Sequence, residues 1–355
     1  MMLSDFRASG LRARSIAGVV AALVCAACSS SSDGSTGSDG GGGGGGGGNS
    51  NPPSLDGCTI FPGDNAMNED VSGLPLNSQS DAYIQAMNPS KKLHPDWGNW
   101  STDHYGIPWQ TGTGAAPIAF SWAASWGNSE SDQVACSGGG GNFCYPIPTD
   151  AKIEGGSGAA TGDDRHLLYI DTSGAPSNCT LYEIYNTQNY SAAPWIADNG
   201  AVFHLGSNAL RPDQWTSADA AGLSVFAGLV RYDEVAAGEI RHAIRFTMQK
   251  SQNGFIHPAT HAAGDADTSL PPMGLRLRLK ASFDASGITG PALVIVTAMK
   301  KYGVILADNG SDWYITGDSD DRWDAIMDDV LSGVGKVTGG DFEVVDTGPI
   351  IPSGG

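Results

Sequence analysis

Residues 274–283, GLRLRLKASF, carry the clearest structural signal in the chain. Leucine at positions 275, 277 and 279 alternates with a basic residue at each following position, which is the period of two expected of a β-strand with one buried face. We expect the leucines to point inward and Arg276, Arg278 and Lys280 to point outward. There the basic row would neutralise acids on a neighbouring strand, or, as the alternative, hold a uronate or sulfate.

Other segments combine apolar runs or alternation with flanking turn residues, and are also predicted as strands. They are 165–171, 179–186, 201–205 and 239–248. In the last of these, Ile240, His242 and Ile244 would share one face, with Arg241 and Arg245 on the other. Asn309-Gly310, between two β runs in 303–317, predicts a hairpin.

Helical signals are fewer and fall in 216–223, 229–238, 290–303 and 322–333. Gly238 would stop the second of these helices and Pro291 would start the third. Many short strands with irregular loops favour a mainly β fold, namely a jelly-roll-like antiparallel β-sandwich with a few short peripheral helices. We assign residues 54–355 to one such domain, loop-rich in its N-terminal part.

The start of the chain has the features of an export signal. Basic residues precede a 12-residue apolar run, Ile16–Ala27, which is too short to span a bilayer. Residues 1–27 are therefore predicted to be a signal peptide, and VCAAC resembles a lipoprotein cleavage box with Cys28 lipidated. Plain secretion is the alternative. Residues 28–53, with nine consecutive glycines at 40–48, would form a flexible tether.

The net charge of the chain limits the classes of partner that it is expected to bind. The formal net charge is −19, and near −21 without residues 1–27, which hold three arginines and one aspartate. An acidic surface excludes nucleic acid as a partner, because phosphate contacts need clustered Lys and Arg, and it favours neutral or cationic ligands. We expect a monomer at the outer membrane or cell surface, attached through Cys28, or a secreted protein.

Four further cysteines in an exported chain indicate two disulfides. Four cysteines allow three pairings. We favour Cys136–Cys144, which would close a glycine-rich loop, and Cys58–Cys179, which would tie the N-terminal arm to the body. A zinc site is the alternative, but the close ligand spacing that it needs is absent.

Carboxylates supply the catalytic candidates. Glu234 lies on the predicted helix 229–238, where Arg231 would pair with it on a wet face; His242 follows on the next strand. Glu183 shares a strand face with Tyr185, and Asp164 precedes strand 165–171. Glu183 with Asp164 or Glu234 is our predicted acid pair. The structural alternatives are surface charges, an outward-facing Glu183 and a hydrogen-bonded core histidine at 242.

Aromatic side chains would supply stacking surfaces for sugar rings, although they also serve as ordinary packing. The predicted substrate-binding residues are Trp97, Trp100, Tyr105, Trp109, Tyr185 and Arg241. No cofactor or catalytic metal is predicted. HPATH (257–261) and DSDD (318–321) are weak metal signals, and the second leaves only a slight case for a structural calcium ion.

Several stretches together resemble a set of secreted bacterial proteins of uncharacterised function. They are DDRHLLYID (163–171), CTLYEIYN (179–186), LVRYDEVAAGEIRHAIRFT (229–247), PPMGLRLRLKASFD (271–284) and KKYGVILADNGSDWYITG (300–317). The resemblance implies a single extracellular domain and transfers no catalytic residue.

These features together predict an extracellular carbohydrate-active protein, a glycoside hydrolase that uses paired carboxylates on a polysaccharide. A non-catalytic lipoprotein module that binds a glycan or a surface partner is the second hypothesis. A polysaccharide lyase, with His242 or Tyr232 as base and an arginine neutralising a uronate, is the third.

Overall fold

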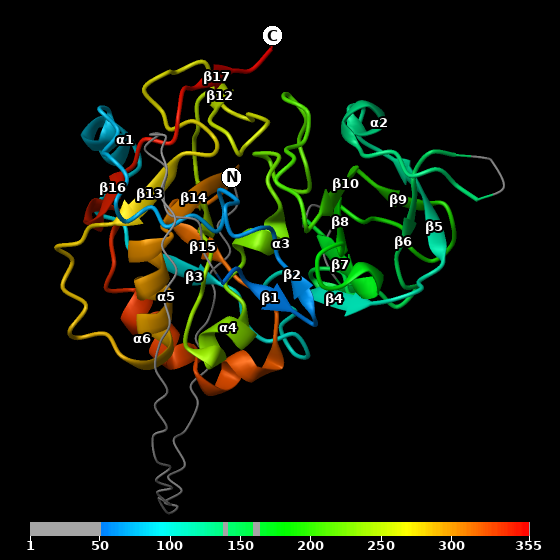
Figure 1. The fold of residues 1–355 in the computed structure, drawn as a ribbon, viewed down its shortest axis with the longest axis horizontal. Helices are drawn as coiled ribbons and strands as arrows, with labels where there is room; N and C mark the ends of the chain where they lie inside the picture. The colour runs from blue at the N-terminus through cyan, green and yellow to red at the C-terminus, as the bar shows by residue number, and fades with distance from the viewer. Residues whose placement is uncertain (1–50, 138–140, 159–163, 355) are drawn as a thin grey trace, which may run out of the picture. The chain divides into compact units, whose positions relative to one another are not determined.

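The computed structural model describes residues 51–137, 141–158 and 164–354, and its largest sheet has six strands in the order β16-β13-β14-β11-β15-β3 (Figure 1). The sheet is mixed: β11 is parallel to β14 and β15 is parallel to β3, whereas the other neighbours are antiparallel. Its strands are β3 (His94–Asp96), β11 (Ile244–Met248), β13 (Arg276–Leu279), β14 (Val304–Asn309), β15 (Tyr314–Thr316) and β16 (Phe342–Val344).

Two helices, α5 (Gly290–Lys301) and α6 (Met327–Val334), pack side by side against this sheet (Figure 1). Helix α5 begins at Gly290, one residue before the predicted Pro291, and buries an apolar stripe that includes Ile295 and Met299. Gly303 turns the chain from α5 into β14 with φ of +72°, and a Cβ there would lie 2.1 Å from the Leu277 carbonyl oxygen. Only glycine fits this turn.

A second sheet has four strands in the order β10-β8-β7-β4, of which only β7 and β4 are parallel. Leu181 on β8 packs into the main core, while Tyr182 and Ile184 pack into a separate aromatic core. Both faces of this sheet are therefore buried. Its strands are β4 (Trp109–Gly112), β7 (Leu167–Asp171), β8 (Thr180–Tyr185) and β10 (Asn199–His204).

A three-stranded sheet, β6-β5-β9, supplies the other side of the aromatic core through Phe120, Trp122 and Trp195. Its strands are β5 (Pro117–Trp122), β6 (Cys144–Pro146) and β9 (Trp195–Ala197). Two short ribbons complete the strands: β1 (Ser54–Leu55) with β2 (Cys58–Thr59), and β12 (Gly254–Phe255) with β17 (Ile351–Pro352).

The remaining helices are short. They are α1 (Ser80–Ala86), α2 (Gly127–Glu130), α3 (Val225–Gly228) and α4 (Tyr232–Ala237), with 3-10 turns at Gly156–Gly158, Thr172–Gly174, Asp321–Ala325 and Gly339–Asp341. Within the described ranges, no helix has the length and apolar character needed to cross a bilayer.

Both favoured disulfides are confirmed: Cys58–Cys179 joins β2 to the residue before β8, and Cys136–Cys144 closes the loop before β6. Two disulfides are typical of an oxidising compartment. The predicted signal peptide, the lipidated Cys28 and most of the tether fall at residues 1–50, outside the described residues.

The mainly β class is confirmed, whereas a jelly-roll sandwich is not, because the largest sheet contains parallel pairs and is covered by helices. The hairpin predicted at Asn309-Gly310 is wrong, since β11 lies between β14 and β15. The strand predicted for 239–248 begins only at Ile244, and segment 216–223 forms turns rather than a helix.

The prediction that the basic row of β13 points to solvent is wrong at Arg276. This side chain is 2% exposed and donates to the carbonyls of Tyr302 and Ala66, because the sheet is covered on both faces. Arg278 is correctly predicted to neutralise an acid on the next strand. It pairs with Glu343, its register partner on β16, at 2.7 Å.

Candidate functional site

A cavity of about 410 Å³ collects side chains from segments far apart in the sequence. Segment 216–220 lines one part of it, and the other contributors include α2, the end of β8 and the end of β14. Its aromatic and ionisable lining residues are Trp126, Glu130, Tyr185, His261 and Asp308. A concave, partly apolar site with a few polar groups is the usual form of a ligand pocket.

Asp308 is the chemically distinctive residue of this cavity. Strand β14 is buried along its first four residues and carries Asp308 next to its end, so the strand delivers a carboxyl group to the cavity from the core. Burial, reinforced by the negative charge of Asp219, raises the pKa of Asp308 to about 7. A carboxyl group with this pKa is protonated in a large fraction of molecules at neutral pH and can act as a general acid.

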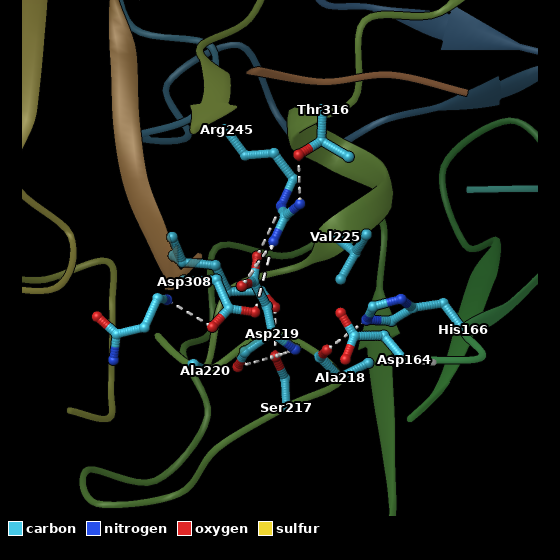
Figure 2. Close-up of polar contacts among 12 residues, drawn as sticks. Asp164, His166, Ser217, Ala218, Asp219, Ala220, Val225, Arg245, Asp308 and Thr316 are labelled. Carbon is cyan, nitrogen blue, oxygen red and sulfur yellow. Dashed lines mark hydrogen bonds and ion pairs between the residues drawn. The ribbon is translucent and has the colours of Figure 1, made fainter. Parts of the chain in front are cut away.

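An ion pair beneath the cavity fixes the charges around Asp308. The Arg245 guanidinium donates two hydrogen bonds of 3.0 Å to the fully buried carboxylate of Asp219 and one of 2.7 Å to Thr316 (Figure 2). It lies 3.9 Å from Asp308. The Asp219 carboxylate thus neutralises most of the charge of Arg245. Asp308 therefore has the anionic Asp219 nearby, and the Arg245 cation is too distant to form a hydrogen bond with it.

His166 holds segment 216–220 from the other side. Its Nε2 lies 2.9 Å from the Ala218 carbonyl oxygen (Figure 2). Its Nδ1 lies 2.7 Å from Glu154, so both ring nitrogens face acceptors. Burial lowers the pKa of His166, but the charge and hydrogen bond of Glu154 outweigh it and raise the pKa to about 9. His166 is therefore an imidazolium that donates from both nitrogens.

Asp164 lies beside Tyr185, which lines the cavity, although Asp164 is not itself a lining residue. The Tyr185 hydroxyl lies 3.5 Å from the Asp164 carboxylate, and burial together with the charges of Asp164 and Asp308 raises the pKa of Tyr185 to about 12. The charge of Asp164 also contributes to the raised pKa of Asp308. Asp164, Tyr185 and Asp308 therefore form one electrostatically connected group.

The backbone next to this group is strained. Arg165 and Asn186 follow Asp164 and Tyr185 directly and have φ values of 48° and 52°. A left-handed conformation costs about 1–2 kcal/mol for a residue with a side chain. This conformation is held by two backbone hydrogen bonds, from the Asn186 amide to the Asp164 carbonyl and from the Thr187 amide to the Arg165 carbonyl. The Arg165 side chain also donates to the Thr187 carbonyl. Strained residues of this kind cluster at functional sites.

Ionised His166 gives a testable pH dependence of stability. A raised folded-state pKa means that its contribution is complete below about pH 6.5 and is lost as pH rises through about 9. We expect the free energy of unfolding to fall by about 3 kcal/mol over that range, and His166→Gln to remove most of this fall, as measured by urea denaturation at several pH values. His257→Gln, at an exposed His–Asp pair, is the control and should leave the fall intact.

Glu183 is not an outward-facing residue. It is 0% exposed, and its carboxylate accepts hydrogen bonds of 2.9–3.0 Å from the Ser224 hydroxyl and from the amides of Val225 and Phe226. These donors surround the first turn of α3, so Glu183 anchors that helix to β8. Burial raises the pKa of Glu183 to about 7, but the carboxyl group does not line the cavity.

Glu234 pairs with Arg231 as predicted, but inside the core rather than on a wet face. Arg231 and His242 are each 1% exposed and lie 2.9 and 3.0 Å from the two oxygens of Glu234. His242 also lies 2.8 Å from the Ala243 carbonyl oxygen through Nδ1, which is the hydrogen-bonded core histidine named as the structural alternative. The predicted pairing of Glu183 with Asp164 or Glu234 is not formed.

Most of the predicted stacking residues lie elsewhere. Trp97 is 1% exposed and cannot stack on a sugar, and Trp109 donates to the buried Asp318. Tyr105 donates to Asp96, and Trp100 packs edge-on against His104. Arg241 pairs with Glu239. Of the six predicted binding residues, only Tyr185 lines the cavity.

The sequence prediction missed Glu130 and Asp308, and it considered His261 only as part of the weak metal signal HPATH. One signal for Asp308 was available: it is the first polar residue after the buried run VILA, and a carboxylate at the end of a buried strand is often functional. No comparable pattern marks Glu130 or His261. Glu130 ends the one-turn helix α2, His261 stands in an irregular segment, and only tertiary contacts bring the two together.

Among the described residues, no group of three or more His, Cys, Asp or Glu side chains is arranged to hold a metal ion. His257 pairs with Asp213, and His261 lies within hydrogen-bond distance of the Ala220 carbonyl oxygen. Asp318 accepts from Trp109, Trp323 and the Tyr232 amide.

Comparison of the chain with protein-family models, curated proteins and solved structures gives no match.

Proposed function

We propose that this protein is an extracellular glycoside hydrolase and that the cavity at Asp308 is its active site. The observation that carries the proposal is the chemical state of Asp308, a carboxyl group that lines a cavity of about 410 Å³ and has a pKa raised to about 7. Glycosidases need one carboxyl group that stays protonated at neutral pH and a second one that stays ionised.

In this mechanism Asp308 donates its proton to the glycosidic oxygen as the bond to the anomeric carbon breaks. The electron pair of that bond stays on the departing oxygen. Water adds its hydroxyl group to the anomeric carbon and gives its proton to Asp164, and exchange with solvent restores the proton on Asp308. Asp164 is the second carboxylate of the pair, oriented by the Tyr185 hydroxyl. The Trp126 and Tyr185 rings at the cavity wall provide surfaces against which a sugar ring packs.

The substrate is proposed to be an extracellular polysaccharide. Two disulfides support export. We further propose attachment of a monomer to the outer membrane or cell surface through lipidated Cys28, with residues 28–53 as the tether. Such a tether gives one domain access to polymers near the surface.

A polysaccharide panel tests the proposal. The purified chain is incubated with neutral, amine-bearing and uronate-bearing polysaccharides, and both new reducing ends and the absorbance of unsaturated products are measured. A hydrolase gives reducing ends without unsaturated products. Unsaturated products would instead support the lyase. Binding without any product would support the non-catalytic module, in which Trp126 and Tyr185 would also serve as surfaces that contact a sugar ring.

A further inference from the structure

We propose that the cavity selects sugars that carry a free amino group, so that the substrate is a cationic, amine-bearing glycan. The inference rests on the proposed function, since it names the substrate of the same site. It is drawn from the hydrogen-bonding character of the lining residues, their aromatic wall and the way in which the neighbouring arginines are engaged.

Glu130 supplies the anionic partner for the amine. One of its carboxylate oxygens accepts from the Thr216 amide at 3.0 Å, and the other makes no hydrogen bond to any described residue. Because Glu130 lines the cavity, this second oxygen is available to a ligand. A hydrogen bond from an ammonium group to a carboxylate is charge-assisted and is about twice as strong as one between neutral groups.

His261 extends the acceptor character of the lining. Its Nδ1 lies 2.7 Å from the Ala220 carbonyl oxygen, and a carbonyl can only accept, so Nδ1 carries the hydrogen. In the neutral ring Nε2 is then an acceptor. Together with Glu130, His261 gives the polar part of the cavity two groups that receive hydrogen bonds from amines and hydroxyls.

The cavity offers no cation to an acidic sugar. Neither lysine nor arginine is among its lining residues, and the two arginines that hold its walls are engaged elsewhere. Arg245 is bound by Asp219 and Thr316. Arg211 pairs with Asp132 and donates to the carbonyls of Glu130 and Thr216, which positions Glu130.

The aromatic lining of the cavity and the net negative charge of the chain both favour a cationic ligand. Trp126 lines the cavity, and an indole ring attracts a cation placed over its face. The chain as a whole carries a formal charge of −19, which raises the local concentration of cationic polymers and lowers that of uronates and sulfated glycans.

The test is direct binding of matched oligosaccharides to the full-length protein by calorimetry below neutral pH, where the sugar amine is protonated. Oligomers of glucosamine, N-acetylglucosamine and glucose of equal length are compared. We expect the glucosamine oligomer to bind about tenfold more tightly than the other two, the value of one charge-assisted hydrogen bond. Added salt should weaken only the glucosamine complex.

Glu130→Gln is expected to bring the affinity ratio between glucosamine and glucose oligomers close to one, because glutamine keeps the shape and loses the charge. Glu239→Gln, which neutralises an exposed glutamate outside this cavity, should leave the ratio unchanged. If Glu130→Gln does not fold, the salt dependence of the wild-type protein decides in its place.

Equal affinities for the three oligomers, or no binding of the glucosamine oligomer, would overturn the inference. The outcome is separable from the proposed function, because binding is measured without turnover. Cleavage of neutral glycans in preference to amine-bearing ones leaves the hydrolase standing and removes the selectivity. Tight binding of the glucosamine oligomer without cleavage of any glycan would support the selectivity and contradict the hydrolase.

Discussion

Asp308→Asn is expected to lower kcat by about 10²–10⁴-fold on a polysaccharide that the wild-type protein cleaves, the usual contribution of a general acid. Asparagine fills nearly the same volume but cannot transfer a proton to the glycosidic oxygen. The substitution also removes a partly buried carboxyl group from the vicinity of Asp219, so the variant should fold at least as stably as the wild type. Initial rates of reducing-end formation and urea denaturation of the same preparation measure the two effects.

The leaving group provides a sharper version of this experiment. An aryl glycoside whose phenol is strongly acidic departs without a proton, so Asp308→Asn should retain most of the wild-type rate on it. Asp265→Asn, in an exposed loop, is the matched control and should leave both substrates unaffected. A polysaccharide rate within about threefold of wild type in the Asp308 variant would exclude Asp308 as the acid.

The same assignment fixes the pH profile. Because Asp308 must be protonated and its pKa is about 7, kcat/KM of the wild-type protein should fall as pH rises through about 7. The Asp308→Asn variant should lose this limb of the profile.

Alternation of apolar and polar residues predicts which segments form strands more reliably than it predicts which face of a strand is exposed to solvent. Strands at 167–171, 180–185 and 276–279 were found because apolar residues recur within them. Arg245 and Arg276 were expected to point outward, and both are buried, because alternation reports exposure only where one sheet face meets water. Both faces of the six-stranded sheet are covered here.

Most residues of the cavity could not be predicted from the sequence either, because their burial also depends on tertiary contacts. Asp219 can be buried because Arg245, 26 residues away in the sequence, supplies its hydrogen-bond donors. Neither segment contains a sequence motif that predicts this contact. Glu183 and Glu234 were predicted to be catalytic carboxylates. Their donors, Ser224 for one and Arg231 with His242 for the other, make them structural, and that distinction depends on contacts that a sequence pattern does not contain.

Removing one member of the buried Asp219–Arg245 pair should have the largest effect on stability. Asp219→Ala is expected to lower the free energy of unfolding by about 3–5 kcal/mol, because it leaves the Arg245 guanidinium buried with only Thr316 and the distant Asp308 as partners. Asp233→Ala, which breaks an exposed pair with Arg322, is the control and should change stability by less than about 1 kcal/mol. Urea denaturation at neutral pH measures both.

The double variant Asp219→Leu/Arg245→Met separates the effect of an unpaired charge from that of lost packing. If the unpaired guanidinium causes the loss, replacing both charged groups with apolar ones should recover most of the stability that Asp219→Ala loses. A double variant as unstable as the single one would show instead that the pair is needed to shape segment 216–220.

Asp219 also links stability to catalysis. Its negative charge contributes to the raised pKa of Asp308, and its carboxylate diverts Arg245, which otherwise lowers that pKa. Asp219→Asn therefore removes a repelling anion and releases an attracting cation, and both changes lower the pKa of Asp308. The falling limb of kcat/KM should move to lower pH in this variant, whereas loss of folding alone would reduce the amplitude of the profile without moving it.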